Sequence, residues 1–175
     1  YSKNLAGNYN EEFNELWNKE FGKGEKVKNP AVYVNGIEIQ NYFCPEDKCA
    51  SRIVSEIKSA RRSVYFMTFT FTNKDIASAL ISKKEIDIKG IFDAGQAGSN
   101  FSQLERLSGM GMNVKKDTNK YKMHHKVFII DNETVVTGSF NPTASAENKN
   151  DENIIIIRDR MIAGSFLKEF DRLWE

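Results

Sequence analysis

The stretch 124–141 constrains the fold more than any other part of the chain. It has two β-rich halves joined by the polar link 131–133. Polar turn residues between two apolar runs predict a β-hairpin. If the loop holds two or four residues, Ile130 lies opposite Val135 in this hairpin.

The same register places four polar side chains on one face. Lys126 lies opposite Ser139 and His124 lies opposite Asn141, and directly opposed residues of a hairpin project from the same side. A neutral imidazole can attack phosphorus, and an ammonium and an amide N–H can stabilise the oxygens around it. We therefore expect this patch to bind a phosphate. The alternative, a hairpin whose polar face only meets water, is less consistent with four such residues on one face. His125 points to the opposite face and is expected to be packed or solvated.

The spacing of these residues resembles the HKD motif of the phospholipase D superfamily. That motif reads H-x-K, four residues, D, six residues, G-S, one residue, N. The chain matches every position, with His124, Lys126, Asp131, Gly138, Ser139 and Asn141. The resemblance extends over most of residues 40–175.

The resemblance also implies roles for these residues. His124 would be the nucleophile or its general-acid counterpart, and Lys126 and Asn141 would bind the phosphate. Ser139 would support them, and Glu152, an acidic residue beyond the motif, would orient an imidazole. Strand alternation points Asp131 away from His124, so Asp131 and the motif residue Gly138 are expected to be structural.

Apolar periodicity outside the motif predicts an α/β fold. Buried strands are expected at 64–71 and 86–92, and an Asn-Gly turn predicts a hairpin at 32–39. Helical stripes lie between them, including one that begins near Pro45. This alternation predicts a mixed β-sheet sandwiched between helices, which is also the phospholipase D-like fold.

A repeat predicts the domain organisation. The segment 6–17 matches 163–174 at six of twelve positions without a gap, and both have the apolar spacing of an amphipathic helix. If the second copy closes an HKD domain, the first closes a preceding one. We therefore expect residues 1–22 to be the closing helix of a preceding HKD repeat, 23–30 a linker, and 31–175 the HKD phosphodiesterase domain.

Composition and charge add few constraints. The net charge is +1, and no clustered ligand set predicts a metal or another cofactor. Cys44 and Cys49 do not by themselves make a disulfide framework, and free or packed thiols are expected. The chain begins at Tyr1, which suggests a fragment or a processed product whose compartment cannot be read.

A lysine-rich segment precedes the motif. Between positions 115 and 126 the chain has five lysines and one acid, Asp117; the four outside the motif are Lys115, Lys116, Lys120 and Lys122. Such a loop is either a solvated surface or a track for a polyanion. The second reading makes these lysines candidate substrate-binding residues.

The expected function is phosphodiester hydrolysis without a metal, through a phosphohistidine. Nucleic acid, DNA or RNA, is the favoured substrate. A phospholipid hydrolase or phosphatidyl transferase is the alternative, although no exposed apolar or aromatic loop is evident for a membrane surface. A non-catalytic half that binds nucleic acid is a third possibility. Because the chain has one H-x-K motif, the second half-site must come from an upstream repeat or from a homodimer partner.

Overall fold

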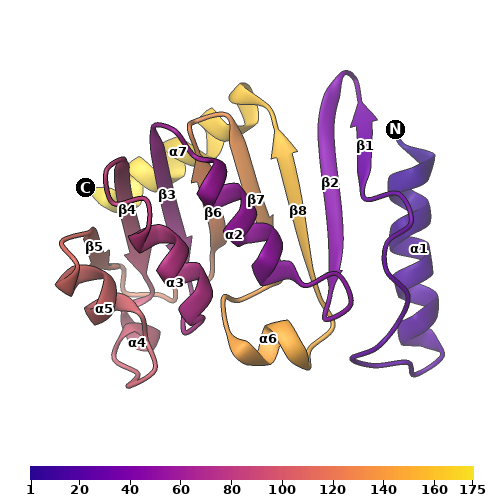
Figure 1. Ribbon diagram of the computed structural model, residues 1–175, viewed down its shortest axis with the longest axis horizontal. Coiled ribbons are helices and arrows are strands. Elements are labelled where there is room, and N and C mark those ends of the chain that lie inside the picture. Colours follow the sequence, from indigo (N-terminus) through magenta and orange to yellow (C-terminus); the bar gives the residue numbers. More distant parts are fainter.

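The computed structural model describes all 175 residues and is built around one eight-stranded mixed sheet (Figure 1). The strand order is β1-β2-β8-β7-β6-β3-β4-β5. The strands are β1 (Ala31–Val34), β2 (Ile37–Cys44), β3 (Ser63–Thr68), β4 (Asp87–Phe92), β5 (Asn113–Lys116), β6 (Lys126–Ile130), β7 (Thr134–Gly138) and β8 (Glu152–Arg158). β3, β4 and β5 are mutually parallel, and the other pairs are antiparallel.

Helices cover both faces of this sheet. They are α1 (Lys3–Trp17), α2 (Cys49–Ser59), α3 (Lys74–Ile81), α4 (Ala94–Ala97), α5 (Leu104–Gly109), α6 (Ala144–Asn148) and α7 (Arg160–Trp174). Apolar residues of α2, α3 and α5 pack with Phe66 and Phe128 on one face, whereas α7 packs on Met67 and Val127 on the other (Figure 1). The expected mixed sheet between helices is confirmed. None of the helices has the length and apolar character needed to cross a membrane.

The β1–β2 hairpin forms where the sequence predicts it. Asn35 and Gly36 both have positive φ, 51° and 81°, which is the backbone of a type I′ turn. β2 then continues to Cys44, beyond the predicted end at Ile39, because its residues 38–44 pair with β8. The helix expected from Pro45 begins four residues later, at Cys49.

The register predicted for the motif hairpin is wrong by one residue. Ile130 pairs with Thr134, not with Val135, because the loop holds three residues. Asp131 and Asn132 have φ values of 55° and 57°, and the Glu133 N–H donates to the Ile130 carbonyl, so a tight turn is followed by one extra residue. Ile130 and Val135 consequently lie on opposite faces of the sheet. Lys126 and Ser139 are therefore not a directly opposed pair.

Asp131 explains why the turn takes this form. Its carboxylate accepts hydrogen bonds from the backbone N–H groups of Arg61, Arg62 and Ser63, at 2.7–3.2 Å. These residues connect α2 to β3. Burial raises the pKa of Asp131, but the hydrogen bonds from this connection outweigh burial and leave the pKa below its usual value. The turn is thus fixed by a segment about 70 residues earlier, which local sequence cannot show.

Gly90 gives a direct test of the packing on the helix-covered face. A Cβ at position 90 would lie 2.0 Å from the Phe66 ring, and Phe66 is fully buried between Phe71, Phe92 and Phe128. We expect Gly90→Ala to lower the free energy of unfolding by about 1–3 kcal/mol through overpacking. Urea denaturation would measure this.

The matched control is Gly164→Ala in α7, where nothing lies within 4 Å of the added methyl. It should be neutral or stabilise by up to about 1 kcal/mol, since alanine favours helix. Equal effects of the two variants would contradict the packing described here.

Asp131 predicts an acid-dependent contribution to stability. A carboxylate whose pKa is lower in the folded chain stabilises above the unfolded value, which is about 3.8, and this contribution is lost as pH falls through the folded pKa. Asp131→Asn should cost about 1–3 kcal/mol at pH 7, because charge-assisted hydrogen bonds are weakened. The difference from wild type should shrink toward pH 3 in urea titrations. Asp171→Asn, on an exposed position of α7, is the control and should change little at either pH.

Candidate phosphodiester site at one edge of the sheet

All the motif residues except Asp131 lie at or near one edge of the sheet, the lower edge in Figure 1. At this edge β3 ends at Thr68 and β6 begins at Lys126, and these two residues are paired. β7 ends here at Gly138, and β8 begins here at Glu152, which is paired with Cys44. Antiparallel pairing therefore brings the two ends of the motif together, although the predicted register was wrong.

His124 lies just before β6, not within it. Its ring is exposed and packs edge-on against the Phe69 ring, with centroids 4.5 Å apart. The Phe69 N–H donates to the His125 carbonyl at 2.8 Å, which ties the loop after β3 to the histidine segment. The imidazole is thus supported on one side and open to solvent on the other.

Lys126 lies beside His124 in a half-buried position. Its Nζ donates to the His124 carbonyl at 2.9 Å and lies 5.4 Å from the Phe69 ring centroid. Burial lowers the pKa of Lys126, and the Glu152 carboxylate opposes this effect. An ammonium held in this way is well placed to stabilise negative charge next to the imidazole.

Asp93 is a residue of this edge that the sequence motif does not include. It is buried at the end of β4, and its Oδ1 caps α4 by accepting the Gln96 N–H. Its Oδ2 accepts the Met123 N–H at 2.9 Å. Asp93 therefore anchors the residue that precedes His124. The one available signal was an Asp at a strand-to-helix junction, which is typical of an N-cap.

Gly138 permits a close approach between β7 and β8. It has a φ of 150°, and a Cβ there would lie 2.2 Å from the Asn153 carbonyl oxygen. The N–H groups of Ser139 and Phe140 both donate to that same oxygen, which makes a β-bulge. The bulge breaks the strand alternation on which the one-face prediction depended.

The bulge determines what Ser139 and Asn141 contact. Ser139 Oγ accepts the Asn153 N–H at 3.0 Å, so this hydroxyl holds β7 against β8. Asn141 has a buried side-chain oxygen without a hydrogen-bond partner. The Thr68 hydroxyl, on the residue paired with Lys126, is also buried and unpaired. Unsatisfied buried polar atoms are costly, and both of these belong to the edge that carries the motif.

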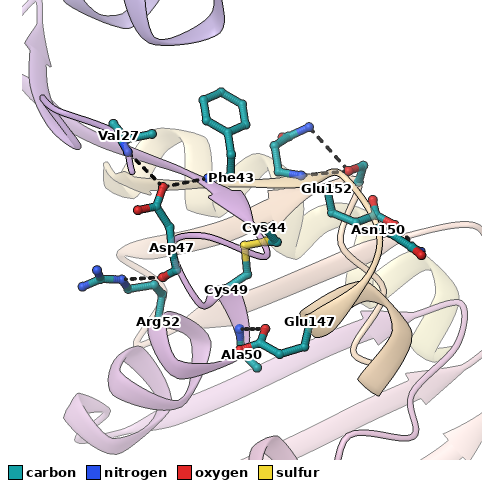
Figure 2. The surroundings of a disulfide bond; sticks show 12 residues. Val27, Phe43, Cys44, Asp47, Cys49, Ala50, Arg52, Glu147, Asn150 and Glu152 are labelled. Carbon is teal, nitrogen blue, oxygen red and sulfur yellow. Dashed lines mark hydrogen bonds between the residues drawn. A yellow bond between two sulfur atoms is a disulfide. The ribbon is translucent and has the colours of Figure 1, made fainter. Parts of the chain in front are cut away.

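Glu152 lies at the same edge, beside a disulfide (Figure 2). Asn150 Nδ2 donates to Glu152 Oε1 at 3.2 Å. Cys44, the strand partner of Glu152, forms a disulfide with Cys49, and both cysteines are fully buried. The expectation of free or packed thiols is therefore wrong. Pairing of β2 with β8 leaves Cys44 at a strand end, 5.8 Å from Cys49 between Cα atoms, which local sequence could not reveal.

The loop between the two cysteines is held from several sides (Figure 2). Asp47 Oδ2 accepts the N–H groups of Phe43 and Val27, at 3.1 and 3.4 Å. Glu147 of α6 accepts the Ala50 N–H at 2.8 Å. These bonds and the disulfide fix the start of α2 and the segment leading to Glu152 at the same edge.

His125 contacts α7. Its Nε2 lies 3.3 Å from Glu169 Oε1. Hydrogen bonds from Arg172, with a further contribution from His125, lower the pKa of Glu169 to about 2. His125 is therefore held against α7 by Glu169.

A cavity of about 360 Å³ lies between His124 and α7. Lys122, Asn119 and Arg172 contribute polar groups to its lining. Of the four candidate lysines, only Lys122 lines this cavity. The structure places Lys115 against the Trp174 carbonyl and ring, Lys116 with Lys115 beside α5, and Lys120 near the Tyr121 ring.

Asp131 lies at the opposite edge of the sheet, at the far end of β6. No group of three or more His, Cys, Asp or Glu side chains is arranged to hold a metal ion. The edge described above therefore offers one exposed imidazole, one half-buried ammonium, an amide and a carboxylate.

The chain is similar to several characterised proteins. The mitochondrial cardiolipin hydrolase of Xenopus laevis is 35% identical over 137 residues, which cover 75% of this chain and 65% of that protein. The phospholipase D of Rickettsia prowazekii is 34% identical over 134 residues, with the same coverage of both chains. This chain therefore spans about two thirds of the length of these relatives.

A solved structure and a family description agree with these similarities. The crystal structure of Nuc from Salmonella typhimurium, a phospholipase D family member, superposes with a TM-score of 0.76 and 34% identity, over 79% of this chain and 94% of that chain. Residues 53–174 match the family described as "Cardiolipin synthase, PLD-like domain". Fold, motif and sequence thus lead to one conclusion: the chain belongs to the phospholipase D superfamily.

Proposed function

We propose that this chain carries one half of a phosphodiesterase site that works without a metal ion and uses His124 as its nucleophile. The convergence of His124, Lys126 and Glu152 with the Ser139–Asn141 segment at one sheet edge is the observation that carries this proposal. Membership of the phospholipase D superfamily supports it.

The chemistry has two steps. The neutral His124 imidazole attacks phosphorus, a P–N bond forms, and the P–O bond to the leaving alkoxide breaks. The alkoxide takes a proton from a second imidazole, which is suited to this by a reference pKa of about 6.5. Water, deprotonated by that second imidazole, then attacks the phosphohistidine and releases His124. Lys126 and Asn141 stabilise the phosphoryl oxygens, Ser139 holds the bulge that presents Asn141, and Glu152 orients an imidazole.

The second imidazole must come from another HKD unit. His125 is engaged by Glu169 on α7, so one chain offers one free imidazole, that of His124, to the phosphate. The unit could be a preceding repeat or a homodimer partner. The matched region fills 94% of the Nuc chain, so the superfamily contains chains with room for little more than one such unit.

Nucleic acid is the substrate that we favour. Lys122 and Arg172 line the cavity that also contacts His124, and Asn119 adds a donor. Glu169, the one acid in that lining, is already paired with Arg172 and bonded to His125. The cavity therefore attracts a polyanion such as a phosphate backbone extending from the site.

A phospholipid is the alternative, and one observation favours it. Sequence reasoning found no exposed aromatic loop, but Phe101 is 77% exposed and Tyr121 is 80% exposed. Both lie on loops that follow or precede strands at the site edge. Exposed aromatic side chains can enter a bilayer surface or stack on bases. Two of the relatives described above are named for lipid hydrolysis.

A substrate panel in excess chelator tests the proposal. Single- and double-stranded DNA, RNA, cardiolipin and phosphatidylcholine vesicles would each be incubated with the protein and with His124→Ala. We expect cleavage of nucleic acid that is insensitive to chelator and absent from the variant. Activity only after a divalent metal is added would refute the mechanism. Cleavage of lipid alone would replace nucleic acid by phospholipid as the substrate.

The two adjacent histidines give a second prediction. His124→Ala should lower kcat at least about 1,000-fold, because the nucleophile is lost, while the melting temperature changes little. His125→Ala should keep kcat within about tenfold, since it removes only a half-exposed contact with Glu169. Steady-state kinetics and thermal melts on both variants would decide this. The reverse result would show that His125, not His124, reaches the phosphate.

A further inference from the structure

α1 presents an apolar face that nothing in this structure covers. Phe13 is 59% exposed and Trp17 is 75% exposed, and their rings stack on each other 5.8 Å apart. α1 lies outside β1, at the end of the sheet farthest from the carboxyl terminus of the chain (Figure 1). Two neighbouring aromatic residues exposed to this extent mark an interaction surface.

Asn8 and Tyr9, about one turn before Phe13, attach α1 to the rest of the chain. Asn8 is buried, and its Nδ2 donates to Asn41 Oδ1 on β2 and to the Asn29 carbonyl, at 2.8 and 2.9 Å. The Tyr9 ring meets the Phe43 ring edge-on, with centroids 5.0 Å apart. The helix is therefore held in place while the stacked pair faces outward.

The sequence repeat indicates the kind of surface against which this face of α1 would pack. Residues 6–17 correspond to 163–174 of α7, so Phe13 and Trp17 correspond to Phe170 and Trp174. Phe170 is 1% exposed and stacks on Tyr65 and Trp174. It packs on an apolar sheet face made by Met67, Ile91, Val127, Ile129 and Val135. The same side chains on α1 have no sheet to cover.

The repeat also matches a glutamate of α1 with a glutamate of α7. Glu12 corresponds to Glu169, which contacts His125 and Arg172. Glu12 has no such cationic partner, and burial together with nearby carboxylates raises its pKa to about 7. The pKa of Glu169 is about 2 because it has partners. α1 thus lacks the apolar sheet face that α7 covers, and its Glu12 lies near carboxylates of its own chain instead of a base.

We infer that the outer face of α1 is a docking surface for the sheet of a second phospholipase D-like unit, which α1 closes as α7 closes the sheet described here. The partner surface is an apolar sheet face that can accept Phe13 and Trp17. A second copy of this chain does not offer that surface, because its own α7 already covers it. The partner is therefore a unit whose sheet has no closing helix of its own.

Exchange of the two helices within the full chain tests whether α1 can close such a sheet. Residues 162–174 would be replaced by the sequence of residues 5–17, and thermal unfolding would be followed by circular dichroism. The control is the same exchange with Phe13→Ser and Leu16→Ser in the inserted segment. Those two positions correspond to the buried residues Phe170 and Leu173, so the control has the helix without its apolar anchors.

We expect the exchanged chain to unfold cooperatively, with a melting midpoint roughly 10 °C or more above that of the control. An exchanged chain that does not fold, or that melts with the control, overturns the inference. These readouts concern folding alone, so they stand or fall separately from the proposed phosphodiesterase activity.

The native helix provides a second measurement. Phe13→Ser with Trp17→Ser in the unexchanged chain should leave the melting midpoint within a few degrees of wild type, because nothing in this chain covers these rings. A large loss of stability would show that the face is already packed. Sedimentation should give the same mass for both proteins. Self-association that the double variant abolishes would make a second copy the occupant and would overturn the inference.

Discussion

The antiparallel pairing of β3 with β6 is the contact on which the position of every proposed site residue depends. It places Phe66 against Phe128 in the core, with Gly90 leaving room for the Phe66 ring. It also pairs Thr68 with Lys126, so a strand that runs toward the site edge meets one that starts there. Because β4 runs parallel to β3 and ends at the same edge, Asp93 can reach the segment before His124. The core packing and the site geometry are thus two consequences of one register.

Much of the fold could be predicted from the sequence because it depends on local patterns. The Asn35-Gly36 turn, the buried strand around Phe66 and the amphipathic α7 each have a signal within a few residues, and each forms in the structure. The mixed sheet between helices follows from the alternation of such segments.

What could not be predicted depends on contacts between distant segments. The turn at Asp131 takes three residues because its carboxylate binds the N–H groups of Arg61 to Ser63. The disulfide forms because β8 extends β2 to Cys44. The motif residues meet through a bulge at Gly138 rather than through strand alternation. The predicted hairpin register was therefore wrong, but strand pairing still places His124, Lys126 and the Ser139–Asn141 segment at one edge of the sheet.

Asp93 holds two separate segments of the site edge at once. One carboxylate binds the first turn of α4 through one oxygen and the Met123 backbone through the other. The buried Asp93 carboxylate therefore supports both the segment that leads to the exposed Phe101 and the segment that leads to His124. Both segments depend on this one carboxylate, so its loss would release both of them together. The aromatic loop and the imidazole about 20 residues further along the chain thus share one buried support.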